Sequence, residues 1–299
     1  MTGPPSTRPP ATSSRCSFLA DAAGDAREGT APPAEQWFLV EHPGPWPRVA
    51  HAGLPEAADL DAWAHAVRGR VLMVRRPGRA GAGAPRRWFR VDSRPGREHV
   101  VTGAVDGPLD PTAAGEPHPG PLHLVCAHGR HDTCCALRGR PLAAALVAAA
   151  PEAAWECSHV GGCRFAPALV LLPHGLVLGG VPGPDAARVV ADYAAGLVVP
   201  ELVRGRSALP PAAQAAQHHA RLATGALGVD DLGVVSVAAP APGRWRVRLA
   251  GPDVMVDLTE EWVAADRRLT CAAPGPGRLR TFTLVSLEPD VPPVLPQPG

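Results

Sequence analysis

Residues 123–163 read HLVCAHGRHDTCCALRGRPLAAALVAAAPEAAWECSHVGGC, and this stretch decides the fold of the 299-residue chain. The apolar run at 123–127 predicts a buried strand. The Ala- and Leu-rich residues at 136–150 predict a helix, with Pro141 as an irregularity near its start. Residues 153–157 predict a second strand, so the sequence indicates a strand–helix–strand unit.

A hairpin and a further helix are expected after this unit. Two apolar runs at 168–181 are separated by a tight turn at His174 and Gly175, and residues 184–197 have the pattern of a helix. The resulting order, β-α-β-β-β-α, is that of a thioredoxin-like core. We therefore expect an α/β fold with a thioredoxin-like central domain over residues 119–204.

The regions on either side predict a small N-terminal α/β unit and a C-terminal α+β region. Apolar runs at 37–40, 71–74 and 87–91 predict strands, and residues 55–68 predict a helix. Residues 211–226 predict another helix, followed by alternating strands. The expected division is a disordered N-terminus at 1–15, the α/β unit at 16–118, the central domain at 119–204, the α+β region at 205–290 and a tail at 291–299.

Charge and hydropathy argue against several classes of protein. The net charge is +1, from 29 basic and 28 acidic residues, which gives no reason to expect a nucleic-acid partner. No apolar run is long enough to cross a bilayer, and the N-terminus lacks the apolar region of a secretory signal. We therefore expect a cytoplasmic protein without a membrane partner. In that reducing setting, clustered cysteines are more often metal ligands or redox thiols than disulfides.

Five of the seven cysteines lie between Cys126 and Cys163, in two segments that each follow a predicted strand. Because the carboxyl ends of adjacent parallel strands lie side by side, both segments are expected at one edge of the sheet. Cys126 and Cys135 are nine residues apart, and a thiolate at the helix start benefits from the helix dipole. His159 precedes Cys163 by four residues. Thiolates combined with an imidazole suit an iron–sulfur cluster or zinc.

Neighbouring residues are expected to support such a site. Gly161 and Gly162 let the backbone approach closely and donate N–H groups to anionic sulfur. His128 and Arg130 lie in the loop before the helix, where they would surround the centre, and Asp132 is expected to cap the helix. A lone cysteine in the C-terminal region, Cys271, is expected to be a small buried hydrophobe.

Two motifs, CAHGRHDTCCALRGRP at 126–141 and WECSHVGGCRFAPALVLLPHG at 155–175, resemble the sucrase/ferredoxin-like family. The stretch from Cys16 through TAPPAEQWFLVEHPGPW also resembles the N-terminal part of that family. The domain of this family is similar to thioredoxin-like 2Fe–2S ferredoxins. The resemblance thus covers roughly residues 16–200, and it implies a 2Fe–2S cluster.

The resemblance also implies a ligand set. Members with a studied cluster pair two cysteines with two histidines, and their second motif is His-x-Gly-Gly-His. This chain has a cysteine in place of the last histidine. The implied ligands are therefore three thiolates and one imidazole, from Cys126, Cys135, His159 and Cys163. Cys134 and Cys157 remain rival ligands.

The function implied is electron transfer between a reductase and an acceptor protein, by a redox carrier rather than an enzyme with its own substrate. Two alternatives stay open. The first is a structural or interaction module stabilised by zinc at the same donors. The second is a thiol–disulfide oxidoreductase that uses Cys134 with Cys135, or Cys157, although no Cys-x-x-Cys motif occurs at a helix start.

Overall fold

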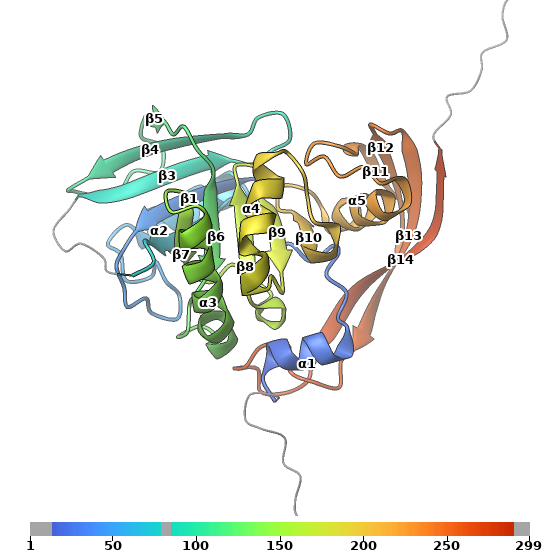
Figure 1. Ribbon diagram of the computed structural model, residues 1–299, viewed down its shortest axis with the longest axis horizontal. Coiled ribbons are helices and arrows are strands. Elements are labelled where there is room, and N and C mark those ends of the chain that lie inside the picture. The colour runs from blue at the N-terminus through green and yellow to red at the C-terminus, as the bar shows by residue number, and fades with distance from the viewer. Residues whose placement is uncertain (1–13, 79–84, 290–299) are drawn as a thin grey trace, which may run out of the picture.

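Two β-sheets and five α-helices make up the part of the chain that the computed structural model describes, residues 14–78 and 85–289 (Figure 1). The fold is mixed α/β, as the sequence predicts. The predictions of a disordered N-terminus, apart from Ser14 and Arg15, and of a tail at 291–299 fall outside the described residues.

The larger sheet contains ten strands, which lie between residues 36 and 206. They are β1 (Gln36–Glu41), β2 (Arg70–Arg75), β3 (Arg86–Asp92), β4 (His99–Val105), β5 (Glu116–Pro117), β6 (Leu122–Cys126), β7 (Ala154–Cys157), β8 (Ala168–Leu172), β9 (Leu176–Gly179) and β10 (Val203–Arg206). Their spatial order is β10-β9-β8-β6-β7-β2-β1-β3-β4-β5. Only the pairs β1–β2 and β6–β7 are parallel. Every residue of β6 and β8 is buried, which explains their continuous apolar sequences.

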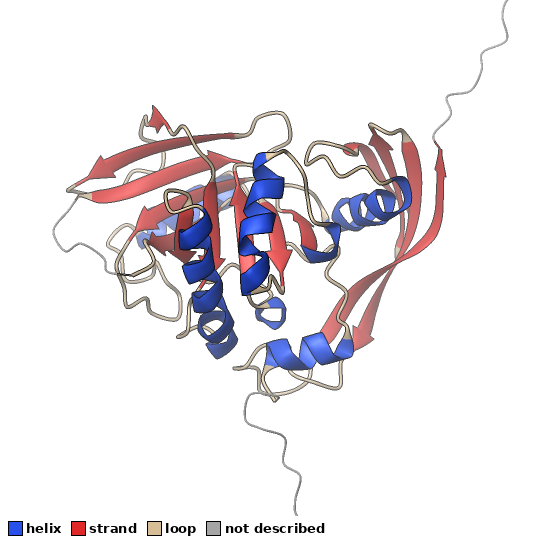
Figure 2. Cartoon of the chain, in the orientation of Figure 1, coloured by secondary structure: helices blue, strands red, loops and turns tan. Residues whose placement is uncertain are grey.

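Five α-helices are present among the described residues. They are α1 (Cys16–Ala23), α2 (Ala57–Ala66), α3 (Thr133–Ala149), α4 (Ala186–Ala194) and α5 (Pro211–Thr224), with short 3-10 turns η1 (Cys163–Phe165), η2 (Gly183–Asp185) and η3 (Pro200–Leu202). Figure 2 shows α3 and α4 side by side in front of the sheet. Val125 and Leu146 share the core beneath these two helices, whereas Leu60 of α2 packs with Phe38 and Met73 in a separate core.

The second sheet is an antiparallel meander of β11 (Gly233–Ala241), β12 (Arg244–Ala250), β13 (Val254–Ala264) and β14 (Arg278–Pro289). Helix α5 packs on it through its small apolar side chains, such as Ala216, which belongs to the same core as Val247 and Val256. The β13–β14 hairpin extends beyond the rest of this sheet and reaches α1 (Figure 1). The loop at the end of the hairpin therefore meets the N-terminal helix.

Most of the predicted elements are present, and the predicted order of the central unit is confirmed. One helix, α1, and three strands, β4, β5 and β10, were not predicted from the sequence. The expected boundary between residues 118 and 119 falls inside the larger sheet, because β5 and β6 both belong to it. Within the described residues, no helix is both long and apolar enough to span a bilayer.

Candidate metal centre

The four donors expected from the sequence come from segments at one edge of the larger sheet. Cys126 is the last residue of β6, Cys135 lies in the first turn of α3, and Cys163 begins η1. His159 lies in the loop between β7 and η1. Because β6 and β7 pair in parallel, with Cys126 opposite Cys157, the two donor-bearing loops leave the sheet on the same side.

The structure brings these four side chains together. The donor atoms of Cys126, Cys135 and His159 all lie within 4.8 Å of one another. The Cys163 sulfur is 3.7 Å from Nδ1 of His159, and it also lies within 4.8 Å of the Cys135 sulfur. All three cysteines are buried, and His159 is half-buried. The predicted set is thus a compact group of three sulfurs and one imidazole.

Hydrogen bonds among the donors favour the thiolate form of two of the cysteines, Cys126 and Cys163. The Cys135 thiol is hydrogen-bonded to Cys126 and Cys163, and this lowers the pKa of both, most strongly at Cys126. The same two hydrogen bonds raise the pKa of Cys135. Burial lowers the pKa of His159, but hydrogen bonds to the Cys126 and Cys163 sulfurs outweigh burial and raise it to about 9. Since the thiolate is the metal-binding form of cysteine, two donors already favour that form.

The glycine pair is required by local backbone geometry. Gly161 and Gly162 have φ values of 117° and 74°, in the left-handed region that favours glycine. A Cβ atom on Gly162 would lie 2.4 Å from Nη2 of Arg204, whose Nη1 donates a 2.9 Å hydrogen bond to the Gly161 carbonyl. The backbone N–H of Val160, just before the pair, is the one that is hydrogen-bonded to Cys126. The loop can therefore pack closely around the sulfurs.

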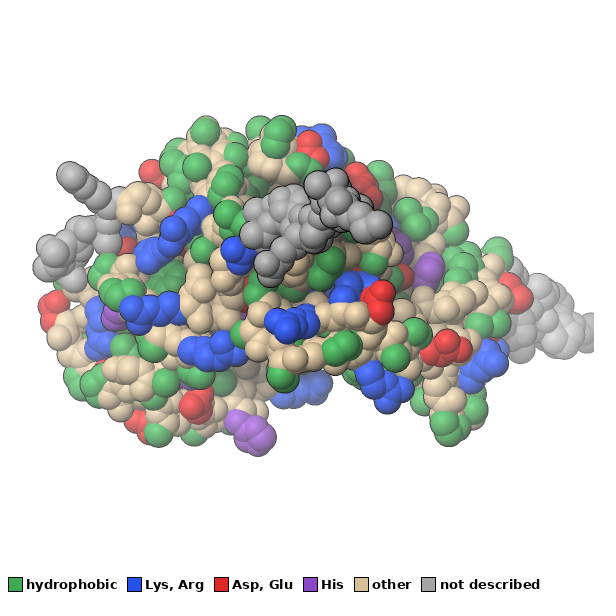
Figure 3. Space-filling view, turned by 90° about the horizontal axis from the view of Figure 1, so that it is seen from below, with side chains coloured by type: hydrophobic (Ala, Val, Ile, Leu, Met, Phe, Trp, Pro, Cys, Tyr) green, Lys and Arg blue, Asp and Glu red, His purple; other side chains and the backbone are tan. Residues whose placement is uncertain are grey.

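Several guanidinium groups lie near the donors, and the local sequence did not indicate those of Arg70 and Arg204. Arg204 is almost fully buried, and burial lowers its pKa to about 9 despite the nearby Cys163 and Cys126. Burial also lowers the pKa of Arg70, whose charge faces Cys157 and Cys126, and of Arg164, to about 10. These cations offset the negative charge of thiolates. Figure 3 shows further arginines spread across the face on the side of α1.

The half-buried face of the site opens toward solvent beside His159. The His131 ring stacks on the His159 ring, with 3.5 Å between centroids and 12° between planes. A cavity of about 180 Å³ adjoins both rings, and Arg48 and His128 contribute to its wall. Of the two loop residues expected around the centre, His128 is buried against Trp46, whereas Arg130 is exposed.

The two rival ligands lie apart from this group. Cys134 belongs to a second group with Cys16, Asp132 and Cys271. Cys157 is fully buried, and burial raises its pKa well above the usual value, so it remains a neutral thiol. The expectation that Cys271 is an isolated buried hydrophobe is wrong, because its sulfur is 3.3 Å from that of Cys134 and the side chain is only partly buried.

Asp132 has the capping role that the sequence predicts. Its carboxylate accepts a 2.9 Å hydrogen bond from the Cys134 N–H at the start of α3. It also accepts a 2.7 Å hydrogen bond from the Cys271 N–H, a contact that local sequence could not indicate. One buried carboxylate therefore fixes both the helix start and the C-terminal loop.

Comparison with known proteins gives one match. A family model described as Sucrase/ferredoxin-like matches residues 28–205, more than half of the chain. No curated protein matches the chain, and no solved structure does. The matched span contains all four donors of the candidate centre, whereas Cys16 and Cys271 lie outside it.

Proposed function

This chain belongs to the sucrase/ferredoxin-like family, and we propose that it is an electron-transfer protein with a 2Fe–2S cluster in a thioredoxin-like domain. The convergence of four donors at one sheet edge carries this proposal. The proposed ligands are Cys126, Cys135, His159 and Cys163. The order β9-β8-β6-β7, with α3 joining the parallel pair, supports the thioredoxin-like assignment.

The chemistry of the donor set fits such a cluster. Soft thiolates together with an imidazole are donors that iron–sulfur centres use, and two of the three thiols already favour the thiolate form. When bound, the cluster would supply a centre that accepts and releases one electron. Zinc would accept the same donors, and the ferredoxin part of the family description favours the cluster.

The protein would then surround the cluster with buried side chains and with cations, and the cluster would be near solvent only on the side of His159. The residues Cys126, Cys135 and Cys163 are each at most 3% exposed. The cations of Arg70 and Arg204 would stabilise the more negative reduced state. His159, beside the cavity that it shares with His131, is our proposed exit point for the electron, where a reductase or an acceptor would dock.

Thiol–disulfide exchange is less well supported by the arrangement. Cys134 and Cys135 lie in different groups, so they do not form a redox pair with each other. Both of these side chains and Cys157 are buried, which keeps them from a protein disulfide. We therefore propose the carrier and not the oxidoreductase.

A potentiometric titration followed by electron paramagnetic resonance tests the proposed function. We expect one reversible one-electron step, with a midpoint above the about −400 mV of all-thiolate plant-type centres and below the about +300 mV limit of two-histidine centres. The absence of any reversible step in protein that has taken up iron and sulfide would refute electron transfer.

A further inference from the structure

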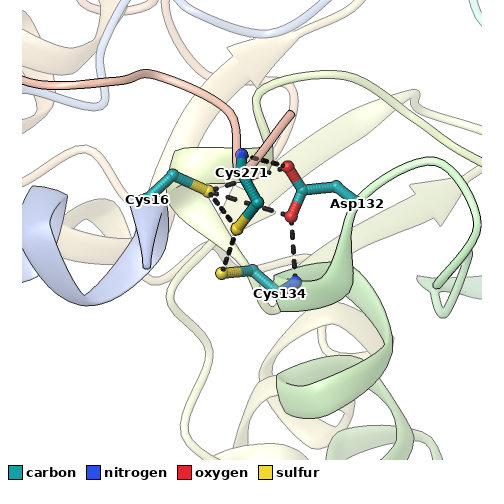
Figure 4. A group of neighbouring side chains, drawn as sticks. All are labelled: Cys16, Asp132, Cys134 and Cys271. Carbon is teal, nitrogen blue, oxygen red and sulfur yellow. Dashed lines mark hydrogen bonds between the residues drawn. The ribbon is translucent and has the colours of Figure 1, made fainter. Parts of the chain in front are cut away.

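A second group of metal-binding side chains lies next to the proposed cluster site. It consists of Cys16, Cys134, Cys271 and Asp132, whose donor atoms all lie within 4.8 Å of one another (Figure 4). The Cys271 sulfur is 3.5 Å from the Cys16 sulfur and 3.3 Å from the Cys134 sulfur. The Cys16 sulfur is 3.8 Å from both oxygens of Asp132. This is the same kind of convergence that marks the first site.

The three cysteines come from distant parts of the chain. Cys16 is the first residue of α1, Cys134 lies in the first turn of α3, and Cys271 lies in the loop between β13 and β14. Cys16 and Cys134 are buried, and Cys271 is half-buried. Although Cys134 and Cys135 are adjacent, successive residues point about 100° apart around a helix, so they serve different groups.

The spacing of the sulfurs suits a tetrahedral ion. With zinc–sulfur bonds of about 2.3 Å, tetrahedral geometry places ligand sulfurs roughly 3.8 Å apart. The observed separations of 3.3 and 3.5 Å need to widen only by a few tenths of an ångström. A disulfide would instead need these sulfurs to approach to about 2.05 Å, and it would leave the third thiol unpaired.

Asp132 supplies a fourth donor whose orientation is already fixed. Its carboxylate is held by the backbone N–H groups of Cys134 and Cys271, at 2.9 and 2.7 Å. A carboxylate oxygen is a normal zinc ligand beside thiolates. Three sulfurs and one oxygen complete a closed set of four, which is typical of a structural site rather than a catalytic one.

We propose that Cys16, Cys134, Cys271 and Asp132 form a second metal site, which binds one zinc ion and joins α1, α3 and the C-terminal hairpin. Binding replaces the thiol protons, which pass to solvent, and involves no change in oxidation state. The site does not depend on the iron–sulfur proposal, because the two sites share no proposed ligand. Its role is to hold the N-terminal and C-terminal segments against the start of α3.

Metal analysis of the full chain and of the double variant Cys16→Ser/Cys271→Ser tests this site. We expect roughly one zinc per wild-type chain and loss of that zinc in the double variant, with iron and sulfide unchanged. The matched control is Cys157→Ser, which removes a buried thiol that belongs to neither group and should retain the zinc. Wild-type protein that binds no zinc when supplied with it, or a folded double variant that retains zinc, would overturn the proposal.

A measurement on the wild-type protein avoids the risk that the double variant does not fold. Alkylation of the thiols, mapped by mass spectrometry with and without a zinc chelator, reports each cysteine separately. We expect the chelator to increase alkylation of all three cysteines of the second site together. A disulfide between any two of them, or alkylation that does not respond to the chelator, would contradict a zinc site.

Discussion

His159 is the residue that distinguishes the proposed centre from an all-thiolate one. Replacing it with cysteine adds a negative charge next to the iron, whereas Cys163→His removes one. We expect His159→Cys to lower the reduction potential and Cys163→His to raise it, each by an amount on the order of 100 mV. Potentiometric titration of both variants measures these shifts, with Cys157→Ser as the control that should leave the potential unchanged. Equal potentials in all four proteins would exclude His159 and Cys163 as ligands.

The buried side chain of His123 should make the free energy of unfolding depend on pH. It is buried in β6, neither ring nitrogen has a hydrogen-bond partner among the described residues, and burial lowers its pKa to about 4. Between pH 6.5 and pH 4 the unfolded chain therefore binds a proton that the folded chain does not. The contribution of His123 to the free energy of unfolding falls as the pH falls, by roughly 2 kcal/mol from pH 7 to pH 5.

Urea denaturation at the two pH values, in wild type and His123→Phe, checks this prediction. The phenylalanine variant removes the titrating group but keeps an aromatic ring near Tyr193, which the His123 ring contacts edge-on. The wild type should lose about 2 kcal/mol more than the variant on acidification. An equal loss in both proteins would show that His123 does not titrate in this range.

At the scale of elements, the contact between α3 and β6 sets the distance between two proposed ligands. Gly139 lies four residues after Cys135, on the same face of α3. A Cβ atom on Gly139 would lie 2.1 Å from the Cys126 carbonyl oxygen, which belongs to the backbone and cannot rotate away. We expect Gly139→Ala to lower the free energy of unfolding by about 1–3 kcal/mol and to reduce bound iron.

Chemical denaturation and iron analysis of this variant provide the measurement. Gly183→Ala is the matched control, because nothing lies within 4 Å of its added methyl group and its φ is not positive. Full stability and full iron content in Gly139→Ala would mean that the helix moves without disturbing the ligands.

The elements and donors that could be predicted from the sequence are those marked by residues close to one another along the chain. Apolar runs in the sequence indicated the strands β6, β7 and β8. The four proposed cluster ligands all lie in or just after a single strand–helix–strand unit. By contrast, β10 reads VRGR, and its arginines are buried only because distant groups pair with them. Cys16 and Cys271 are 255 residues apart, so no spacing rule could connect them.

At the scale of the whole molecule, the N-terminal segment joins the two sheets. The Ala31 N–H donates a 3.0 Å hydrogen bond to Gln214 of α5, and Arg280 of β14 donates one of 3.1 Å to the Gly29 carbonyl. Asp25 forms an ion pair with Arg267, which lies in the loop after β13. The same segment also binds the larger sheet, because the Thr30 N–H donates a 3.2 Å hydrogen bond to the Arg204 carbonyl in β10.

We therefore expect the two sheets to unfold together. Native-state hydrogen exchange should give amides of β12 and β13 an opening free energy within about 1 kcal/mol of that for amides in β6 and β8. The comparison of these two sets within one sample is its own control. A C-terminal sheet that opens at a free energy lower by several kcal/mol would show that the region after residue 206 is a separate unit.

The central claim concerns the group bound by Cys126, Cys135, His159 and Cys163. The most direct measurement is the visible spectrum of protein purified without oxygen, with iron, sulfide and zinc quantified in the same sample. We predict a brown protein with roughly two irons and two sulfides per chain. A colourless protein that holds zinc at these four donors, and stays colourless after cluster reconstitution, would contradict the account.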